Sequence, residues 1–435
     1  MSDPALQLAA FRADITPPIG HPLCAGWYPS ATGVANPLSA NGIVLLPEGE
    51  LPIVLCALDW AELSNGEYDL WRERLAATAG TSPDRVAVHC THCHDAPWPD
   101  RDAQDILDQE GYPNVIMWRP WADAALENVC SALRHATPNA ELINGVRAGR
   151  APVHQIASNR RLLGSDGKVK GVRWTRCRDA VLRAEPDGLI DSHLKTISFY
   201  KDDRKVAALH YYAVHPTSHD GTGSVTCEFV GLARDRLMAE EGVPHIYFTE
   251  CAGNITTGKY NDGAGDYREL FSNRIYDAMI QAGKNAVTCP SFPVEWRVAP
   301  LLLPLRSDQK KPDLLALIRD PLAISKTRSR AALILAYQRR YEAGRPIPLS
   351  ALCLGSGIII LHTPGEAFIE YQLFAQKLAP DAIVAVPSYG DCGPGYITLE
   401  RSFEEGGYEP RDSFCSGDSE TLMRRAIESV LHPGQ

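Results

Sequence analysis

Residues 85–95 read Arg85-Val86-Ala87-Val88-His89-Cys90-Thr91-His92-Cys93-His94-Asp95. The first half is a short valine-rich run, which predicts a buried strand at residues 85–90. Imidazole, thiol and carboxylate groups follow at the point where this strand ends. Because open α/β sheets place their chemistry at the carboxyl ends of strands, the stretch predicts both a sheet and a functional site at its edge.

Strands and helices are predicted to alternate along most of the chain, which favours the α/β class. The predicted strands are 52–59, 85–90, 194–200, 205–213, 246–250, 356–362 and 382–386. The predicted helices are 66–79, 117–135, 228–241, 267–282, 327–343, 366–378 and 419–431. We therefore expect an α/β fold in which mixed sheets are flanked by helices.

The 435 residues are more than one hydrophobic core usually carries. We expect residues 1–435 to form a single large catalytic domain, with a two-lobed organisation as the alternative. The weakest part of the pattern is 284–312, which has five prolines and little periodicity. This segment is either a linker between two halves of the chain or a surface segment of a single domain.

The composition narrows the class of protein. A net charge of −10 and the absence of a Lys/Arg run argue against a nucleic-acid partner. The first residues lack the basic region and the apolar stretch of a secretory signal peptide. No later segment approaches the roughly 20 apolar residues of a membrane span. The 12 cysteines are scattered, as expected of free thiols in a reducing compartment. We expect a cytoplasmic enzyme with a small-molecule substrate and no stable membrane anchor.

Five segments place a metal ligand or a proton-transfer group at a predicted strand end or helix start. They are Thr91-His92-Cys93-His94, Val214-His215-Pro216-Thr217-Ser218-His219, Phe248-Thr249-Glu250-Cys251-Ala252-Gly253-Asn254-Ile255-Thr256-Thr257-Gly258, Ile360-Leu361-His362-Thr363-Pro364-Gly365-Glu366, and Gly393-Pro394-Gly395-Tyr396 with Gly406-Gly407-Tyr408-Glu409. Each segment taken alone also has a purely structural interpretation.

His92 and His94 are two apart, so on an extended segment they would point to opposite sides unless the loop curls. The proline between His215 and His219 disfavours one helix holding both. Glu366, expected in the first turn of a helix, could simply stabilise the helix dipole. Taken together, however, mixed nitrogen and oxygen ligands at three positions plus water are what a catalytic zinc site requires. Zinc suits hydrolysis of amides or esters, because it acidifies bound water and polarises a carbonyl.

The Cys90-Thr91-His92-Cys93 stretch is a Cys-x-x-Cys motif, but no second thiol pair follows at the spacing of a structural zinc site. A zinc ribbon is therefore not expected. Free cysteine behaves as a small core hydrophobe, so we expect Cys90 and Cys93 to be buried thiols.

The order of the motifs resembles the neutral (non-lysosomal) ceramidase family from about residue 10 to about residue 412. The resemblance rests on Asp14-Ile15-Thr16-Pro17-Pro18-Ile19-Gly20, Thr91-His92-Cys93-His94, Asn159-Arg160, Val214-His215-Pro216-Thr217-Ser218, Gly253-Asn254-Ile255-Thr256, Pro364-Gly365-Glu366 and Tyr396…Tyr408. The individual motifs are short, and their shared order makes the resemblance specific.

The resemblance implies one catalytic Zn²⁺. Its ligands would be His92, His215, Glu366 and Tyr396. The residues implied to line the reacting carbonyl are His94, Arg160 and Tyr408, so that His92 takes the metal while His94 faces elsewhere. Thr256 stands where the family has a serine.

Two segments depart from the family pattern. Gly253-Asn254-Ile255-Thr256-Thr257-Gly258 replaces Gly-Asp-Val-Ser-Pro-Asn, and Asp95-Ala96-Pro97-Trp98-Pro99 replaces Ser-Gly-Pro-Gly-Gly. The chain also shows no secretion signal and no C-terminal immunoglobulin-like domain. We therefore expect a small soluble substrate rather than ceramide.

The favoured hypothesis is a zinc-dependent hydrolase of a C–N amide bond, with a lactone or ester hydrolase as the nearest variant. A second hypothesis is a metal-free hydrolase with Thr256 or Cys251 as nucleophile and His219 or His94 as base. A third is a non-catalytic metal- or ligand-binding protein on the same scaffold.

Overall fold

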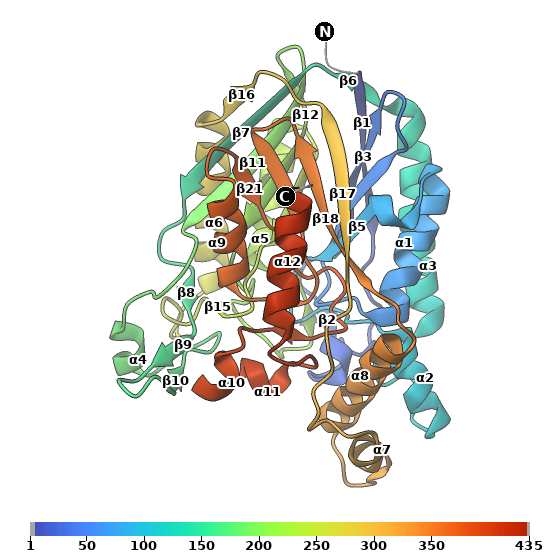
Figure 1. Ribbon diagram of the computed structural model, residues 1–435, viewed down its shortest axis with the longest axis vertical. Coiled ribbons are helices and arrows are strands. Elements are labelled where there is room, and N and C mark those ends of the chain that lie inside the picture. Colours follow the sequence, from blue (N-terminus) through green and yellow to red (C-terminus); the bar gives the residue numbers. More distant parts are fainter. Residues whose placement is uncertain (1–4, 433–435) are drawn as a thin grey trace.

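The structure is a computed structural model that describes residues 5–432 of the chain. Three sheets form its centre, and helices pack along their outer sides (Figure 1). The α/β class with mixed sheets and flanking helices is confirmed. Among the described residues, no helix has both the length and the apolar character needed to cross a bilayer.

The first sheet has the strand order β5-β4-β3-β1-β6. Its strands are β1 (Leu6–Asp14), β3 (Ser39–Pro47), β4 (Ile53–Leu58), β5 (Val86–Cys90) and β6 (Glu141–Ile143). The second sheet has the order β14-β12-β11-β7-β16. Its strands are β7 (Gly145–Pro152), β11 (His193–Lys201), β12 (Arg204–Tyr212), β14 (His245–Thr249) and β16 (Val287–Cys289).

The third sheet has the order β17-β18-β19-β21, with strands β17 (Val294–Leu301), β18 (Ile347–Leu354), β19 (Ile358–His362) and β21 (Ile383–Ala385). Four short pairs lie outside these sheets. They are β2 (Gly33–Val34) with β13 (Ser224–Val225), β8 (Ser158–Asn159) with β15 (Ile255–Thr256), β9 (Arg161–Leu163) with β10 (Val169–Val172), and β20 (Glu366–Ala367) with β22 (Tyr396–Ile397).

The helices cover the sheets from several sides. They are α1 (Asn65–Ala79), α2 (Arg101–Gln109), α3 (Arg119–Ala136), α4 (Ala180–Ala184), α5 (Glu228–Glu241), α6 (Tyr267–Lys284), α7 (Lys311–Arg319), α8 (Ser325–Glu342), α9 (Ile369–Leu378), α10 (Ser402–Glu405), α11 (Glu409–Asp412) and α12 (Ser419–Leu431). Three short 3₁₀ helices are η1 (Cys24–Gly26), η2 (Pro83–Arg85) and η3 (Thr137–Asn139). Helix α3 packs on the first sheet, α6 on the second and α12 on the third. Helices α1 and α5 end where Gly80 and Gly242 adopt left-handed φ angles of 71° and 66°.

Each sheet contains one parallel pair, namely β4–β5, β12–β14 and β19–β21. The segments that follow these strands meet one another. Cys90 donates its N–H to Tyr389 O at 2.9 Å, and Ser388 donates to Thr249 O at 3.0 Å. The Thr249 hydroxyl donates to Thr91 O at 2.7 Å. The carboxyl ends of strands from all three sheets therefore converge on one place.

The hydrophobic core connects the sheets. One cluster of buried side chains draws on the first, second and third sheets, with Leu55, Ile197 and Leu352 as examples. Burial of this kind is the main stabilising contribution to a fold of this size. It also fixes the relative positions of the strand ends that carry polar residues.

Residues 284–312, where the sequence pattern is weakest, contain β16 in the second sheet and β17 in the third. One expectation from the sequence is wrong. Glu366 does not lie in the first turn of a helix, because it pairs in β20 and helix α9 begins only at Ile369.

Candidate active site

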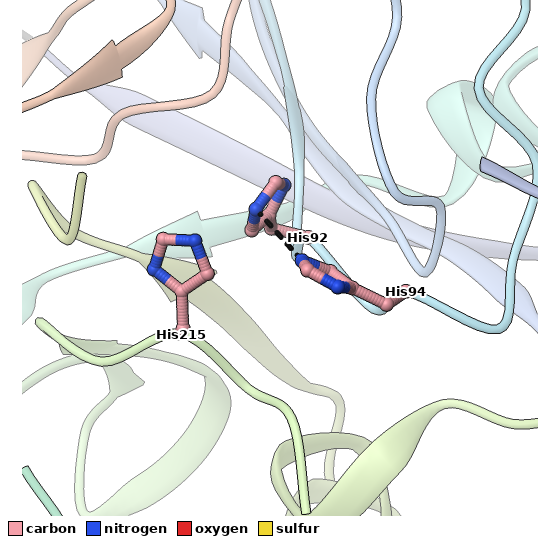
Figure 2. A group of neighbouring side chains, drawn as sticks. All are labelled: His92, His94 and His215. Atoms are coloured by element: carbon pink, nitrogen blue, oxygen red, sulfur yellow. Dashed lines mark hydrogen bonds between the residues drawn. The ribbon is translucent and has the colours of Figure 1, made fainter. Parts of the chain in front are cut away.

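His92 lies two residues beyond the end of β5. Thr91 donates its N–H to Leu58 O at 2.7 Å and His92 donates to Trp60 O at 2.9 Å, so the chain stays attached to the segment after β4. His92 has a left-handed φ of 68°, which turns the chain sharply. The loop therefore curls, which is the condition under which the sequence allows His92 and His94 to face the same side. Their Nε2 atoms lie 3.2 Å apart, and Figure 2 shows both rings beside that of His215.

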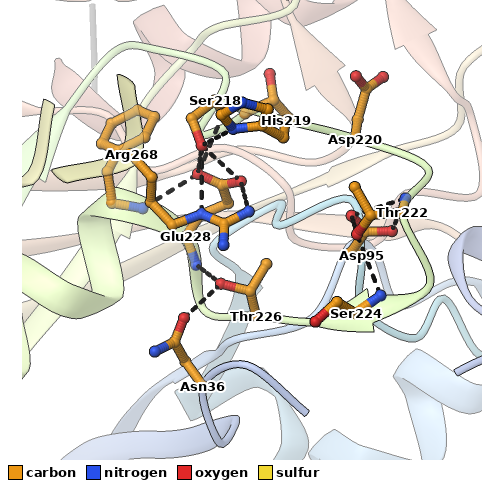
Figure 3. A network of polar contacts seen from close by, with 12 residues as sticks. Asn36, Asp95, Ser218, His219, Asp220, Thr222, Ser224, Thr226, Glu228 and Arg268 are labelled. Atoms are coloured by element: carbon orange, nitrogen blue, oxygen red, sulfur yellow. Dashed lines mark hydrogen bonds and ion pairs between the residues drawn. The ribbon is translucent and has the colours of Figure 1, made fainter. Parts of the chain in front are cut away.

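His215 follows β12 in a loop that other buried groups hold in place. Glu228, at the start of α5, accepts hydrogen bonds from the Ser218 N–H at 3.2 Å and from the Ser218 hydroxyl at 2.8 Å. Arg268 pairs with the same carboxylate at 3.3 Å (Figure 3). These contacts fix the loop that carries His215.

Backbone carbonyls determine the tautomers of two imidazoles. His92 Nδ1 lies 2.9 Å from Ala61 O, and His215 Nδ1 lies 2.7 Å from Ala252 O. Because a carbonyl only accepts hydrogen bonds, both Nδ1 atoms carry the proton. The Nε2 atoms of both rings then carry the lone pairs with which an imidazole binds a metal.

Both Nε2 atoms face the carboxylate of Glu366. The distance to Glu366 Oε2 is 3.3 Å from His92 Nε2 and 3.0 Å from His215 Nε2. Glu366 owes this position to the parallel pairing of β20 with β22, which sets Glu366 in register with Tyr396. The close approach requires Gly365, which has a φ of 61° and whose added Cβ would lie 2.7 Å from Gly395 O.

The charge states suit metal binding. Burial alone would raise the pKa of Glu366, but the neighbouring His92 and His215 imidazoles lower it below its ordinary value. Burial, with the nearby Arg160 guanidinium, lowers the pKa of His215 to about 4. The site therefore combines an ionised Glu366 carboxylate with a neutral His215 imidazole, which are the forms that coordinate metals.

The residues fit a zinc ion. His215 Nε2 and Glu366 Oε2 are buried and have no hydrogen-bond partner among the described residues. The ligand atoms of His92, His94 and His215 lie within 4.8 Å of one another, and so do those of Glu62, His92 and Glu366. Imidazole nitrogen with carboxylate oxygen is a donor set suited to zinc. Buried polar atoms without partners are rare, and a cation would satisfy both of these.

Glu62 belongs to this cluster although sequence reasoning missed it. Its Oε1 atom lies 3.7 Å from His92 Nδ1. Burial, and secondly the charge of Glu366, raises the pKa of Glu62 well above its ordinary value. A carboxyl group three residues after the predicted strand 52–59 was a signal that could have revealed it.

Arg160 lies beside two tyrosines of the candidate site. Its Nε donates to Glu409 Oε1 at 2.8 Å, and its guanidinium also donates to the Gly253 carbonyl. The guanidinium carbon lies 5.2 Å from the ring centre of Tyr396 and 5.3 Å from that of Tyr408. The cation is thereby fixed beside both phenol rings.

A pocket of about 240 Å³ contains this arrangement. The eight residues expected from the sequence as ligands or catalytic groups all line it: His92, His94, Arg160, His215, Thr256, Glu366, Tyr396 and Tyr408. Among the lining residues that the sequence did not single out are Cys24, Trp27, Tyr28, Glu62, Trp174, Thr175, Asp220, Lys326, Arg411, Asp412 and Phe414. Trp98, from the segment that departs from the family pattern, also lines the pocket.

The groups required by a metal-free mechanism are less well placed. Cys251 and His219 do not line the pocket, and burial raises the pKa of the Cys251 thiol to about 12. No histidine in residues 5–432 hydrogen-bonds to the Thr256 hydroxyl. Cys90 and Cys93 are buried free thiols, as expected.

Asp95 holds the loop on the far side of His94. Its carboxylate accepts hydrogen bonds from the Thr222 N–H at 3.0 Å, the Thr222 hydroxyl at 2.7 Å and the Gly223 N–H at 3.2 Å (Figure 3). This loop carries Asp220, which accepts a hydrogen bond from Tyr28 at 2.9 Å. The Tyr28 hydroxyl in turn lies 3.4 Å from His94 Nδ1.

Replacing Asp95 with alanine is expected to lower the free energy of unfolding by about 1–3 kcal/mol, because three donors lose their charged acceptor. The candidate metal ligands are untouched, so the metal content should not change. Chemical denaturation and metal analysis would measure both quantities. Thr222→Ser, which keeps the hydroxyl and the N–H, is the matched control. An Asp95→Ala protein as stable as the wild type would show that the contacts do not hold the loop.

No protein-family model matches the chain. A search of curated proteins finds no relative either. Among solved structures, the neutral ceramidase from Pseudomonas aeruginosa is similar, with a TM-score of 0.69 and 14% sequence identity over 99% of this chain and 74% of that one. A ceramidase complexed with C2 gives a TM-score of 0.70 and 14% identity over 98% and 75%. At this identity the likeness concerns architecture, and it shows that the chain has the fold of the neutral ceramidases.

Proposed function

We propose that the chain is a zinc-dependent hydrolase that cleaves a C–N amide bond. The observation that supports it best is the pair of imidazoles, each fixed by a backbone carbonyl, whose Nε2 atoms face the unpartnered Glu366 carboxylate. His92, His215, Glu366 and Tyr396 would hold the ion. When bound, zinc supplies a Lewis acid that polarises the carbonyl and acidifies water.

His94 would handle the proton in this reaction. Its Nδ1 contacts the Tyr28 hydroxyl rather than a backbone carbonyl. The Tyr28 hydroxyl donates its proton to Asp220, so its oxygen accepts from His94 Nδ1–H and leaves the Nε2 lone pair of His94 as the basic site. His94 can then take a proton from the attacking water and return it to the leaving amine.

Arg160 and Tyr408 would stabilise the negative charge that develops on the carbonyl oxygen. Arg160 is held rigidly by Glu409 and the Gly253 carbonyl, so little reorganisation is needed during the reaction. Burial raises the pKa of Tyr408 above its ordinary value, so its hydroxyl stays a hydrogen-bond donor. These groups support a catalytic role over a purely metal-binding one.

The pocket supports a small, polar substrate rather than ceramide. Its volume of about 240 Å³ is at or below the lower end for drug-sized ligands. Charged side chains such as Asp220, Lys326 and Arg411 line it. A lactone or ester hydrolase on the same site is the nearest alternative, because the same groups would act on its carbonyl.

The same proposal includes a single domain over residues 1–435 and a cytoplasmic location. The core cluster that draws on all three sheets supports the first. The 12 cysteines, all unpaired in the described structure, support the second because reducing compartments keep thiols free.

Metal removal tests the proposal. The purified protein is expected to contain about one zinc per chain. Dialysis against a chelator should abolish hydrolysis of N-acyl compounds, and added zinc should restore it. The screen should include lactams, lactones and esters, so that the preferred bond is identified. Full activity in chelator, with covalent labelling of Thr256 or Cys251, would contradict the zinc mechanism.

A further inference from the structure

Trp27 and Lys326 lie side by side in one wall of the pocket, and neither is a proposed metal ligand. Trp27 directly follows η1, and Lys326 lies in the first turn of α8. The Lys326 ammonium lies 4.5 Å from the centre of the Trp27 ring. The mechanism proposed above uses neither residue.

Lys326 differs from the other charged groups of the pocket. Asp412 pairs with Arg330 at 2.7 Å, and Arg160 pairs with Glu409 at 2.8 Å. Within residues 5–432, no carboxylate lies at ion-pair distance from the Lys326 ammonium. The first turn of α8 also lacks acidic residues, so the positive end of the helix dipole adds to this charge.

Trp27 has an unsatisfied donor. Its Nε1 atom is buried and has no hydrogen-bond partner in the described part of the chain. An indole N–H only donates, and buried tryptophans usually find an acceptor for it. A cation and a lone N–H donor thus lie on the same wall without an acceptor between them.

We propose that this wall binds a carboxylate of the substrate, so that the enzyme acts on amides that carry an anionic group, such as N-acyl amino acids. One carboxylate oxygen would accept from Lys326 and the other from the Trp27 N–H. A neutral lipid amide would leave both donors without a charged acceptor, which disfavours its binding. The choice of substrate rests on the proposed hydrolase function, whereas carboxylate binding itself can be measured without turnover.

Binding of a hydrolysis-resistant pair to the zinc-loaded full chain tests the proposal. The first compound is the ketone isostere of N-benzoylglycine, with a methylene in place of the amide N–H, and the second is its neutral carboxamide. Calorimetry should show that the wild type binds the carboxylate about tenfold more tightly than the carboxamide. Lys326→Met should remove this preference, and Trp27→Phe, which keeps a ring but loses the N–H, should reduce it.

Lys310→Met is the matched control, because Lys310 is also an exposed lysine but does not line the pocket. It should keep the wild-type preference. Equal binding of both compounds by the wild type, or an unchanged preference in Lys326→Met, would overturn the carboxylate subsite. If the preference is present but N-benzoylglycine and a wider amide panel are not hydrolysed, the subsite stands and the hydrolase proposal fails.

Discussion

Replacing His92 with alanine is expected to remove zinc from the purified protein and to lower amide hydrolysis by about a thousandfold or more. The imidazole supplies one of the two Nε2 atoms that face Glu366 Oε2, at 3.3 Å. Without it, the remaining donors no longer surround a cation with the number of ligands that zinc requires. His215→Ala should behave in the same way, because its Nε2 lies 3.0 Å from the same oxygen.

Metal analysis and steady-state kinetics on the same preparations measure both losses. Because His92 has a left-handed φ of 68°, His92→Asn is a useful second variant, since asparagine tolerates that conformation better than alanine. His135→Ala removes an exposed imidazole from α3 and serves as the control. A fully metal-loaded and active His92→Ala protein would exclude the proposed site.

Replacing Lys195 with methionine is expected to lower the free energy of unfolding by about 3–5 kcal/mol at neutral pH. The buried ammonium lies 2.7 Å from Asp191 Oδ2 and 2.8 Å from Glu250 Oε2. Methionine fills a similar volume but leaves two buried carboxylates without a cation. Glu250 also accepts the Val386 N–H at 2.9 Å, so the loss extends to the segment after β21.

The unfolding free energy lost in Lys195→Met should become smaller as the pH falls. Burial alone would raise the pKa of Asp191, but Lys195 holds it below its ordinary value, so the wild type keeps this stabilisation until the pH falls below about 4. Without the ammonium, burial raises the carboxyl pKa values in the folded variant. The variant then regains stability as the pH falls through those raised values. The difference between wild type and variant is therefore largest near about pH 7 and smaller near about pH 5.

Denaturant titrations at several pH values check this result. Lys205→Met is the control, since Lys205 pairs with Glu241 at 2.6 Å in a partly exposed position, where an ion pair contributes little. A difference in unfolding free energy that stays constant from neutral to acidic pH would show that the buried carboxylates do not cause the instability.

The sequence predicted the fold best where the pattern is local. Helices α5 and α12 have the boundaries expected at 228–241 and 419–431, because apolar spacing and end signals act within a few residues. Strand β17 was missed because prolines mask it, with Pro300 inside the strand. It lies at the edge of its sheet, where a proline removes no hydrogen bond that the sheet needs.

In the candidate site, too, the sequence predicted what depends on local patterns and missed what depends on distant residues. His92, His215 and Glu366 come soon after strands that the sequence predicts, so their convergence follows from the α/β arrangement. Glu366 was assigned to a helix because its pairing with Tyr396 is non-local and has no sequence pattern. Lys326 comes from a segment whose approach to the pocket depends on tertiary packing alone.

The acceptors that fix His92 and His215 are the main-chain carbonyls of Ala61 and Ala252. A main-chain oxygen is present whatever side chain stands at that position. Substitutions at either alanine that fit the available space therefore leave the imidazole protonation states unchanged. Where a carboxylate side chain orients a metal-binding histidine, a single mutation can remove it. Here the path of the backbone orients both imidazoles. Their ability to bind a metal through Nε2 can therefore be retained when neighbouring side chains are substituted.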